Sequence, residues 1–339
     1  AGVFRISVTA NDGKSLKDVE LGVNEAFALF EKDGVTDRDI ARVKAGLETG
    51  FYNGISSVQG KAFQLASYNV FAGSPSFIET DIENIQKVTK EDVMRVYNTY
   101  IKDMPFVMTS FVPKGKLDLI ADNSIKAEVV EEKIVENIQK QTTEQNTEQV
   151  VKTPSVFDRS LEPVQGDSPA LNVPESWRQE LSNGMMVYGI GQNEIPTVNF
   201  SLVMDGGHLL DAIEKNGVAS LITDIMMEGT ATKTPQELQE EIEMLGANIN
   251  MYTTRESIVI QVNTLVRNYE ATLALVEEIL TQPRWDLEEF GRIKTAAINR
   301  VKRSSANPNA VAGRVFNKLL YGEDHIFAYP NTGTATSIA

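Results

Sequence analysis

Apolar residues recur every three or four positions in several long stretches, which is the spacing of an amphipathic helix. Thr36 and Thr89 stand just before acidic residues that suit the first turn of a helix, and Thr234-Pro235 places proline at a first helical position. We therefore predict helices over 16–31, from Thr36 onward, over 56–71 and 89–101, and then over 216–230, from Thr234 to Gly246, and over 269–281, 286–303 and 308–321.

Alternating apolar and polar residues predict the strands. Residues 3–9, 106–112 and 197–204 alternate in this way, and 247–264 has room for two strands. The sequence Ser182-Asn183-Gly184 lies between 179–181 and 185–190. Asn-Gly between two apolar runs is a strong hairpin signal.

The middle of the chain has a different composition. The run QKQTTEQNTEQ at 139–149 holds no apolar residue, and prolines follow at 154, 163, 169 and 174. Such a composition does not bury a core, so we predict a linker over about 118–176 with one short helix near 128–138. The chain then divides into residues 1–117, the linker, and residues 177–339.

Two blocks of the chain resemble each other at a constant distance. Each block has a strand, an apolar-faced helix, a short break and a helix with an acidic start. The separation is the same at each matched pair, since 273 − 23 = 250 and 293 − 43 = 250. This favours two copies of one α/β domain; the matched pairs are Val23 and Leu273, Ala26 and Val276, Phe30 and Leu280, Val43 and Ile293, and Lys44 and Lys294.

Composition excludes several classes of function. The 339 residues carry a formal net charge of −15, which argues against nucleic acid or an anionic membrane as partner. No apolar run approaches the ~18 residues of a membrane span. There is no cysteine, so disulfides and thiolate chemistry are excluded. The absence of cysteine is compatible with any cellular compartment. Because the chain opens in a predicted strand, we expect it to be part of a larger protein.

The stretch NGVASLITDIMMEGT, residues 216–230, resembles a known zinc-binding helix. In the M16 (pitrilysin/insulinase, mitochondrial processing peptidase) metallopeptidases this helix carries H-x-x-E-H within G-x-A-H-x-x-E-H-x-x-x-x-G-T. Gly217, Ala219, Gly229 and Thr230 match that pattern. The positions of the two histidines and the glutamate are filled by Ser220, Thr223 and Asp224.

The resemblance covers nearly the whole chain outside the linker. Further matches are 88–93, Leu181-x-Asn183-Gly184, Leu245-Gly246-Ala247 and Asn307-Pro308. It implies an α/β (α+β) fold of two repeated M16-type domains, each a mostly antiparallel sheet with helices packed on one face. Residues 1–117 would be the C-terminal part of one repeat. Residues 177–339 would be the N-terminal part of the next, non-catalytic repeat.

The family's last zinc ligand is a glutamate on a later helix, and the alignment places it at Arg300, since 300 − 224 = 76. The resemblance thus implies that Ser220, Thr223, Asp224 and Arg300 are degenerate positions without catalytic, cofactor-binding or metal-binding roles. Zinc would be bound elsewhere in the full-length protein. In the family the strand corresponding to 249–253 pairs with the substrate in the catalytic repeat; whether it does so here is left open.

For several other polar side chains, a structural role is weighed against a metal-binding role. His208 and His325 are interpreted as ordinary polar residues because they are far apart in the sequence. Asp224 and Glu228 could face a cation, but such a pair is more often the solvated edge of a helix. Alternatively, Asp224 and Arg300 form a salt bridge in place of the zinc site.

Three hypotheses follow for function. In the first, the chain is the central, non-catalytic part of a zinc-dependent M16 endopeptidase and helps enclose peptide substrates. The full-length protein would be a hydrolase, and this part alone inactive. In the second, it is a degenerate homologue that acts as scaffold or peptide-binding partner of an active subunit. In the third, it is an unrelated acidic α/β protein. An H-x-x-E-H motif upstream would distinguish the first from the second.

Overall fold

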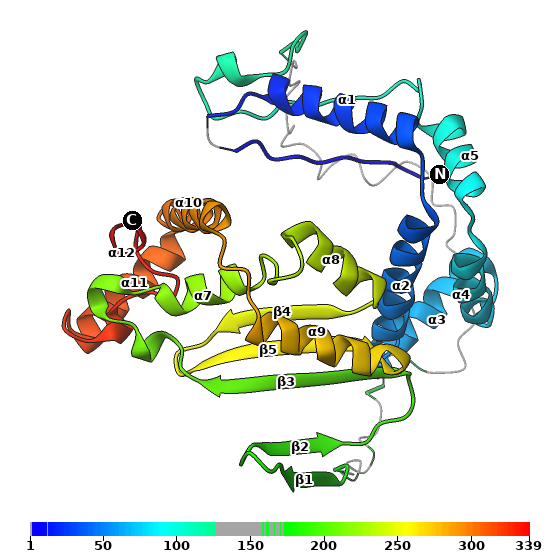
Figure 1. Ribbon diagram of the computed structural model, residues 1–339. Coiled ribbons are helices and arrows are strands. Elements are labelled where there is room, and N and C mark those ends of the chain that lie inside the picture. Colours follow the sequence, from blue (N-terminus) through cyan, green and yellow to red (C-terminus); the bar gives the residue numbers. More distant parts are fainter. Residues whose placement is uncertain are drawn as a thin grey trace. The chain divides into compact units, whose positions relative to one another are not determined.

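The computed structural model describes residues 2–11, 13–126 and 173–339, with residues 158, 161, 162, 166 and 170 between them. It divides into two compact units, the first made of residues 1–27 and 106–191 and the second of 28–105 and 192–339. Figure 1 shows the chain as a ribbon. The helix predicted over 128–138 and most of the linker predicted over 118–176 lie outside the described residues.

The first unit contains the predicted hairpin. Strand β1 (Ser176–Glu180) pairs antiparallel with β2 (Met186–Ile190). Gly184 has a φ of +84°, a left-handed conformation that glycine adopts at little cost, so Asn-Gly forms the turn as expected. Trp177 lies across Gly189, where a Cβ would stand 2.1 Å from the indole ring. The hairpin prediction is confirmed.

The other strands predicted near this unit are not formed among the described residues. Residues 3–9 and 106–112 make no strand pairing there, and their apolar side chains stay exposed, for example Val3 at 83%, Val107 at 91% and Phe111 at 88%. A strand needs a neighbour to satisfy its backbone N–H and C=O groups, and no described residue of the unit supplies one. The prediction of a sheet in the first part of the chain is therefore wrong for the residues described.

Helices fill the first part of the chain. Helix α1 (Leu16–Asp33) is followed by α2 (Asp37–Gly54), α3 (Val58–Ala72), α4 (Phe77–Lys87) and α5 (Lys90–Tyr100). Thr36 and Thr89 form capping boxes with Asp39 and Asp92, as the sequence suggested. Helix α4 was not predicted, although Ile78, Ile82 and Ile85 recur at helical spacing.

The second unit is built on a three-stranded antiparallel sheet of β3 (Thr197–Asp205), β4 (Asn248–Thr253) and β5 (Ser257–Leu265) in the order β3-β5-β4. The register aligns rows of side chains across it. Phe200 lies opposite Val262, which lies opposite Ile249. On the other face the row Asn199, Asn263 and Asn248 is polar and the row Val203, Val259 and Tyr252 is apolar, so one face is apolar and the other is mixed.

Several helices accompany the sheet in this part of the chain. They are α7 (Val218–Met226), α8 (Pro235–Met244), α9 (Tyr269–Thr281), α10 (Leu287–Ser304), α11 (Pro308–Tyr321) and the short α12 (Ala335–Ile338). The core joins α8 and α9 to the sheet through Leu238, Ile242, Leu275, Val276 and Ile279. A mostly antiparallel sheet with helices on one face is thus confirmed for this unit. No helix of the described residues is long and apolar enough to cross a bilayer.

The constant separation found in the sequence reappears in the helix boundaries. Helix α10 begins and ends at that separation from α2, since 287 − 37 = 250 and 304 − 54 = 250. The starts of α3 and α11 have the same separation, since 308 − 58 = 250. The surroundings differ, because Ile293 of α10 is 5% exposed and its counterpart Val43 is 54% exposed. Two complete copies of one domain remain a prediction.

The loop between α7 and α8 is tied down by one carboxylate of α9. Glu278 accepts hydrogen bonds from the hydroxyls of Thr230 and Thr232, both at 2.5 Å, and pairs with the ammonium of Lys233 at 2.7 Å. Hydrogen bonds from Lys233, then from Thr230 and Thr232, lower the pKa of Glu278 to about 2. The carboxylate therefore holds the loop as long as it is ionised.

We predict that Glu278→Gln lowers the free energy of unfolding by roughly 1–3 kcal/mol at pH 7. Because the folded pKa is depressed, this stabilisation is present above the unfolded pKa of about 4.5 and is lost as the pH falls toward about 2. Urea unfolding of the wild type and the variant at pH 7 and pH 2.5 measures the difference. Glu277→Gln, at the exposed neighbouring position, is the matched control. A difference that is as large at pH 2.5 as at pH 7 would contradict the prediction.

Candidate functional site

The start of α7 is fixed by a buried carboxylate, since the side chain of Asp211 is 4% exposed. Asp211 accepts hydrogen bonds from the backbone N–H groups of Gly217 at 2.8 Å and Ala219 at 3.0 Å. These are N–H groups that a helix start leaves without an internal partner. Gly217 has no side chain with which to cap them and adopts a φ of +100°. Asp211 is therefore the N-terminal cap of α7, supplied from outside the helix.

His208 connects that cap to the end of the chain. Its ring is 2% exposed; Nδ1 lies 3.3 Å from an oxygen of Asp211, and Nε2 lies 3.1 Å from the carbonyl oxygens of Ile326 and Tyr329. A carbonyl oxygen only accepts, so Nε2 carries a hydrogen. His325 has a separate role, since its Nδ1 accepts from the backbone N–H of Phe327 at 3.1 Å. Each histidine thus has its own partners within the fold.

Close backbone contacts reinforce the same junction. A Cβ on Gly217 would stand 2.7 Å from the Cα of Gly333, so only glycine fits there. The side-chain amide of Asn216 donates to the carbonyl of Pro330 at 3.2 Å, and the hydroxyl of Ser337 donates to the carbonyl of Asn216 at 2.7 Å. The segment 325–338 thereby fixes the position of α7.

On α7, the hydroxyl of Thr223 takes part in a structural contact. Thr223 is 2% exposed, and its hydroxyl donates to the carbonyl of Ser220 at 2.8 Å. One residue earlier, the carbonyl of Ala219 accepts from the hydroxyl of Thr253 at the end of β4, at 3.0 Å. Thr223 thus faces the interior, and its oxygen already takes part in a backbone hydrogen bond.

The carboxylates of α7 and its C-terminal end face arginines of α10. Asp224 lies 3.6 Å from the guanidinium of Arg300, and Glu228 lies 2.5 Å from that of Arg292. The salt bridge between Asp224 and Arg300, one of the interpretations drawn from the sequence, is confirmed. Burial raises the pKa of Asp224 and Glu228 raises it further, whereas the charge and hydrogen bond of Arg300 lower it; burial is the largest effect.

The structure therefore brings Asp224 of α7 and Arg300 of α10 together. Ser220 and Thr223 lie on α7, as Asp224 does. This set of residues does not fit a zinc ion. Zinc takes nitrogen, sulfur or carboxylate donors, and Arg300 has neither a lone pair to offer nor a removable charge. Within the described parts of the chain, no three acidic, histidine or cysteine side chains are grouped so that they could hold a metal. No metal-dependent step can be assigned to these residues.

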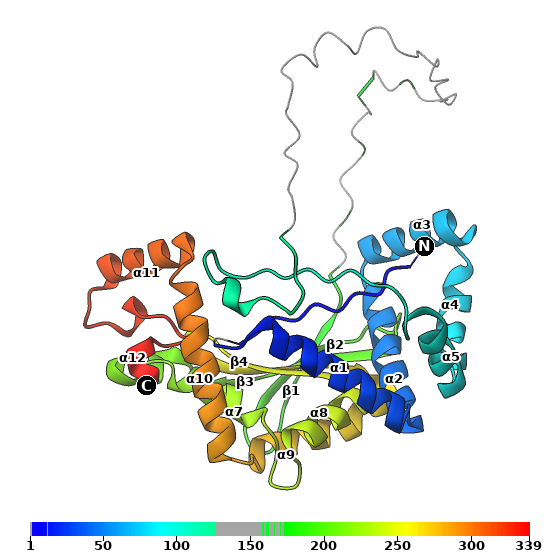
Figure 2. The same cartoon turned by 90° about the horizontal axis from the view of Figure 1, so that it is seen from above.

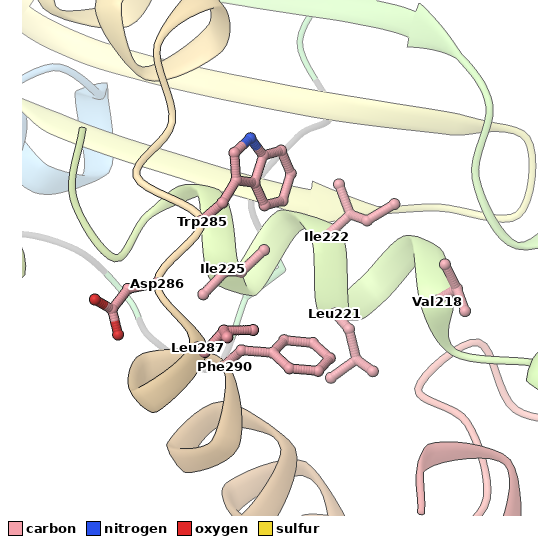
Figure 3. Close-up of a pocket in the computed structure, with 8 residues that line it drawn as sticks. All are labelled: Val218, Leu221, Ile222, Ile225, Trp285, Asp286, Leu287 and Phe290. Atoms are coloured by element: carbon pink, nitrogen blue, oxygen red, sulfur yellow. The ribbon is translucent and has the colours of Figure 1, made fainter. Parts of the chain in front are cut away.

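An apolar groove of about 350 Å³, which sequence analysis did not identify, lies between α7 and the start of α10 (Figure 3). Helix α7 contributes Leu221 and Ile225 to it, and Leu287 and Phe290 come from the start of α10. Trp285 closes one side from the connection before α10, with a φ of +49° that is unusual for a bulky residue. The spacing of the apolar residues over 216–230 predicted a helix. It did not predict that part of the apolar face of this helix borders a groove.

The strand predicted at 249–253 is at the edge of the described sheet. Among the described strands, β4 pairs with β5 alone, and Ile249 and Met251 point into the core while Asn248 and Asn250 are exposed. On its outer side no described strand pairs with its backbone groups, which is the arrangement that strand addition by a peptide requires. Pairing of a peptide with this edge stays a prediction.

We predict that Asp211→Ala lowers the free energy of unfolding by roughly 2–4 kcal/mol, since the backbone N–H groups of Gly217 and Ala219 would lose their acceptor in a buried place. An unsatisfied buried group costs about 1–3 kcal/mol. Urea unfolding followed by the fluorescence of Trp285 and Trp177 measures this. Glu214→Ala, on the same connection but exposed, is the control and should change stability little. Equal effects of the two variants would show that Asp211 is not the cap.

We predict that Arg300→Gln raises the pKa of Asp224 further and costs less than about 1 kcal/mol at pH 7, because Arg300 is 53% exposed. Since the folded pKa of Asp224 is raised, its ionisation opposes folding as the pH rises through that value, and Arg300 offsets part of the effect. The variant should match the wild type at pH 3. NMR titration of Asp224 and urea unfolding test this, with exposed Arg303→Gln as control. A lowered pKa of Asp224 in the variant would contradict it.

Comparison with known proteins identifies part of the chain. Residues 190–326 match the family model described as Insulinase (Peptidase family M16). A probable mitochondrial-processing peptidase subunit beta of Arabidopsis thaliana is 25% identical over 141 residues, covering 42% of this chain and 27% of that protein. An uncharacterized zinc protease of Rickettsia felis is 21% identical over 160 residues, covering 47% of this chain and 39% of that protein.

A solved structure shows the same degree of likeness. The peptidase M16 inactive domain from Pseudomonas fluorescens is 25% identical, with a TM-score of 0.46, covering 48% of this chain and 40% of that one. The chain matches well under half the length of these relatives. The matched region contains the sheet, α7, the groove and the pair Asp224 and Arg300. Residues 190–326 of this chain are thus a segment of the insulinase family, peptidase family M16.

Proposed function

We propose that this chain is a non-catalytic central part of a zinc-dependent M16 metalloendopeptidase. It would help to enclose peptide substrates, while another repeat supplies the H-x-x-E-H site. The observation that carries the proposal is the ion pair of Asp224 with Arg300, at 3.6 Å. We align these two positions with zinc ligands of the family. An arginine in that place makes the fold independent of a metal and at the same time excludes one.

Electrostatics supports this assignment. A guanidinium about 4 Å from a metal site would oppose each unit of metal charge by about 4 kcal/mol at an effective dielectric constant of about 20. Thr223 could not accept a proton from a bound water as the family's glutamate does. Its buried hydroxyl is also directed to the carbonyl of Ser220. The four positions together therefore favour a structural role.

The relatives supply the second part of the proposal. One bears the name of a processing peptidase subunit and another that of a zinc protease, and each extends well beyond the matched region. We propose the domain plan of residues 1–117, a linker at 118–176 and residues 177–339 as parts of two successive repeats. The equal separation of α2 from α10, and of the start of α3 from that of α11, supports it.

The described surface suggests how the chain would contact a peptide. The outer edge of β4 offers backbone groups without a strand partner among the described residues, and the end of β4 is held to α7 through Thr253. An extended peptide could add to that edge. Such contacts would hold a substrate without cleaving it, in keeping with the unsuitability of Ser220, Thr223, Asp224 and Arg300 for zinc.

A second candidate is a degenerate M16 homologue that serves as scaffold or peptide-binding partner of an active subunit. The name of the Arabidopsis relative, a subunit, favours it. The same ion pair is compatible with both candidates. They differ in whether the complete polypeptide cleaves peptides by itself or only when an active partner is present.

We predict that the purified chain contains no stoichiometric zinc and does not cleave a quenched fluorogenic peptide library. Zinc is measured by elemental analysis after gel filtration, and cleavage with and without a chelator. The reason is ligand chemistry, because a catalytic zinc needs three protein donors and Asp224 alone of the four positions offers one. The quadruple variant Ser220→His, Thr223→Glu, Asp224→His and Arg300→Glu should bind zinc.

Control variants separate the outcomes. Arg300→Glu alone should leave the chain without zinc, because Ser220 and Thr223 still provide no strong ligand. Zinc bound by the wild type at one equivalent and lost in Asp224→Ala, or cleavage abolished by the chelator, would overturn the proposed role of this segment.

A further inference from the structure

Helix α2 contacts the second part of the chain along a line of polar groups, although the contacting residues are far apart in the sequence. Figures 1 and 2 both show α2 beside the C-terminal end of α8. Both belong to the second compact unit. We call these contacts the α2 seam; it consists of Arg38, Arg42, Ala45, Glu48, Thr49 and Asn53 on α2, and of Glu240, Glu241, Glu243, Gly246, Asn263 and Arg267 opposite them.

The centre of the α2 seam is one buried hydrogen bond at a glycine. The hydroxyl of Thr49 donates to the carbonyl of Gly246 at 2.7 Å, and Thr49 is 6% exposed. Gly246 has a φ of +56°, and a Cβ there would stand 2.7 Å from that hydroxyl and 2.8 Å from the carbonyl oxygen of Ala45. Only glycine allows α2 to approach the turn between α8 and β4 so closely.

Ion pairs flank the centre on both sides. Toward the start of α2, Arg42 pairs with Glu243 at 2.9 Å, and Arg38 approaches Glu240 at 3.5 Å. Toward its end, both nitrogens of the Arg267 guanidinium bind the carboxylate of Glu48, at 2.6 and 2.7 Å. Asn53 and Asn263 exchange hydrogen bonds beyond that.

Apolar burial contributes little to the seam. The core of the second unit is drawn from residues between 200 and 280, with none of its described members in 28–105. On α2 itself, Val43 and Leu47 are 54% and 50% exposed. An interface of ion pairs and hydrogen bonds without a shared apolar core resembles contacts that form and separate, more than the packed interior of a domain.

We propose that the α2 seam is a reversible, salt-sensitive latch that holds residues 28–105 against residues 192–339. The partly exposed ion pairs are each worth about 0–1 kcal/mol, and salt screens them, since the Debye length falls from about 10 Å at 0.1 M to about 3 Å at 1 M. Opening would free α2 from the turn at Gly246 without disturbing the sheet. The inference does not depend on the proposed function, because it concerns contacts within the chain.

The chain has no cysteine, so two introduced ones can be labelled selectively. We would place spin labels at Thr99→Cys and Thr295→Cys, both exposed and on either side of the seam, and measure their distance distribution by pulsed electron spin resonance. At 0.1 M NaCl one closed population is expected. At 1 M NaCl the fraction with a longer distance should rise at least fivefold. This comparison needs no substitution in the seam.

Variants of the seam test its specificity. Arg267→Glu should produce the longer distance already at 0.1 M NaCl, and the charge-swapped pair Glu48→Arg with Arg267→Glu should restore the shorter one. Gly246→Ala should open the seam by steric conflict, whereas Thr49→Ser keeps the hydroxyl and should leave it closed. Lys318→Glu, which breaks the exposed pair between Lys318 on α11 and Glu323 just after that helix, is the control outside the seam.

Thermal unfolding of each labelled variant checks that the second unit is folded. Two outcomes would overturn the inference. One is an unchanged distance distribution at 1 M NaCl and in Arg267→Glu, which would make the seam a permanent contact. The other is an equal lengthening in Lys318→Glu, which would show that opening is not controlled by these contacts.

Discussion

The second unit depends on the burial of one face of its three-stranded sheet. The register that places Phe200, Val262 and Ile249 in one row decides every other placement, since a slip by one residue would turn these side chains to water and the asparagine row into the core. Helices α8 and α9 are held by that face through Leu238, Leu275 and Ile279. With one face covered, β4 remains as an edge of the described sheet, and Asn199, Asn248 and Asn250 remain exposed on the opposite face.

Helix α7 is positioned by other forces. It is anchored at its start by Asp211 and His208, at its side by the hydroxyl of Thr253, and toward α10 by two ion pairs. In the M16 pattern a metal would link the same two helices through their side chains. Here Asp224 with Arg300, and Glu228 with Arg292, make the link with opposite charges. Two ion pairs thus connect α7 and its C-terminal end with α10.

The pairing of Asp224 with Arg300 has an energetic reason. Asp224 is a partly buried carboxylate between two helices, and burial there raises its pKa and so opposes its ionisation. An arginine from α10 supplies the missing positive charge without any external ligand. The same logic of paired charges recurs in the α2 seam, where arginines and glutamates meet across distant parts of the chain.

The sequence by itself determined most of the helices and the hairpin. Periodicity and capping residues predicted α9 and α11 at their observed bounds, and Asn183-Gly184 predicted the turn, because these signals are local. The salt bridge between Asp224 and Arg300 was also among the interpretations of the sequence, and the structure contains it. Only the tertiary structure decided whether residues 3–9 and 106–112 form strands, since a strand requires partners that its own pattern does not specify. It likewise decided the anchoring of α7 by Asp211 and His208 and the contact of Thr49 with Gly246, because these contacts join residues that no short-range spacing relates.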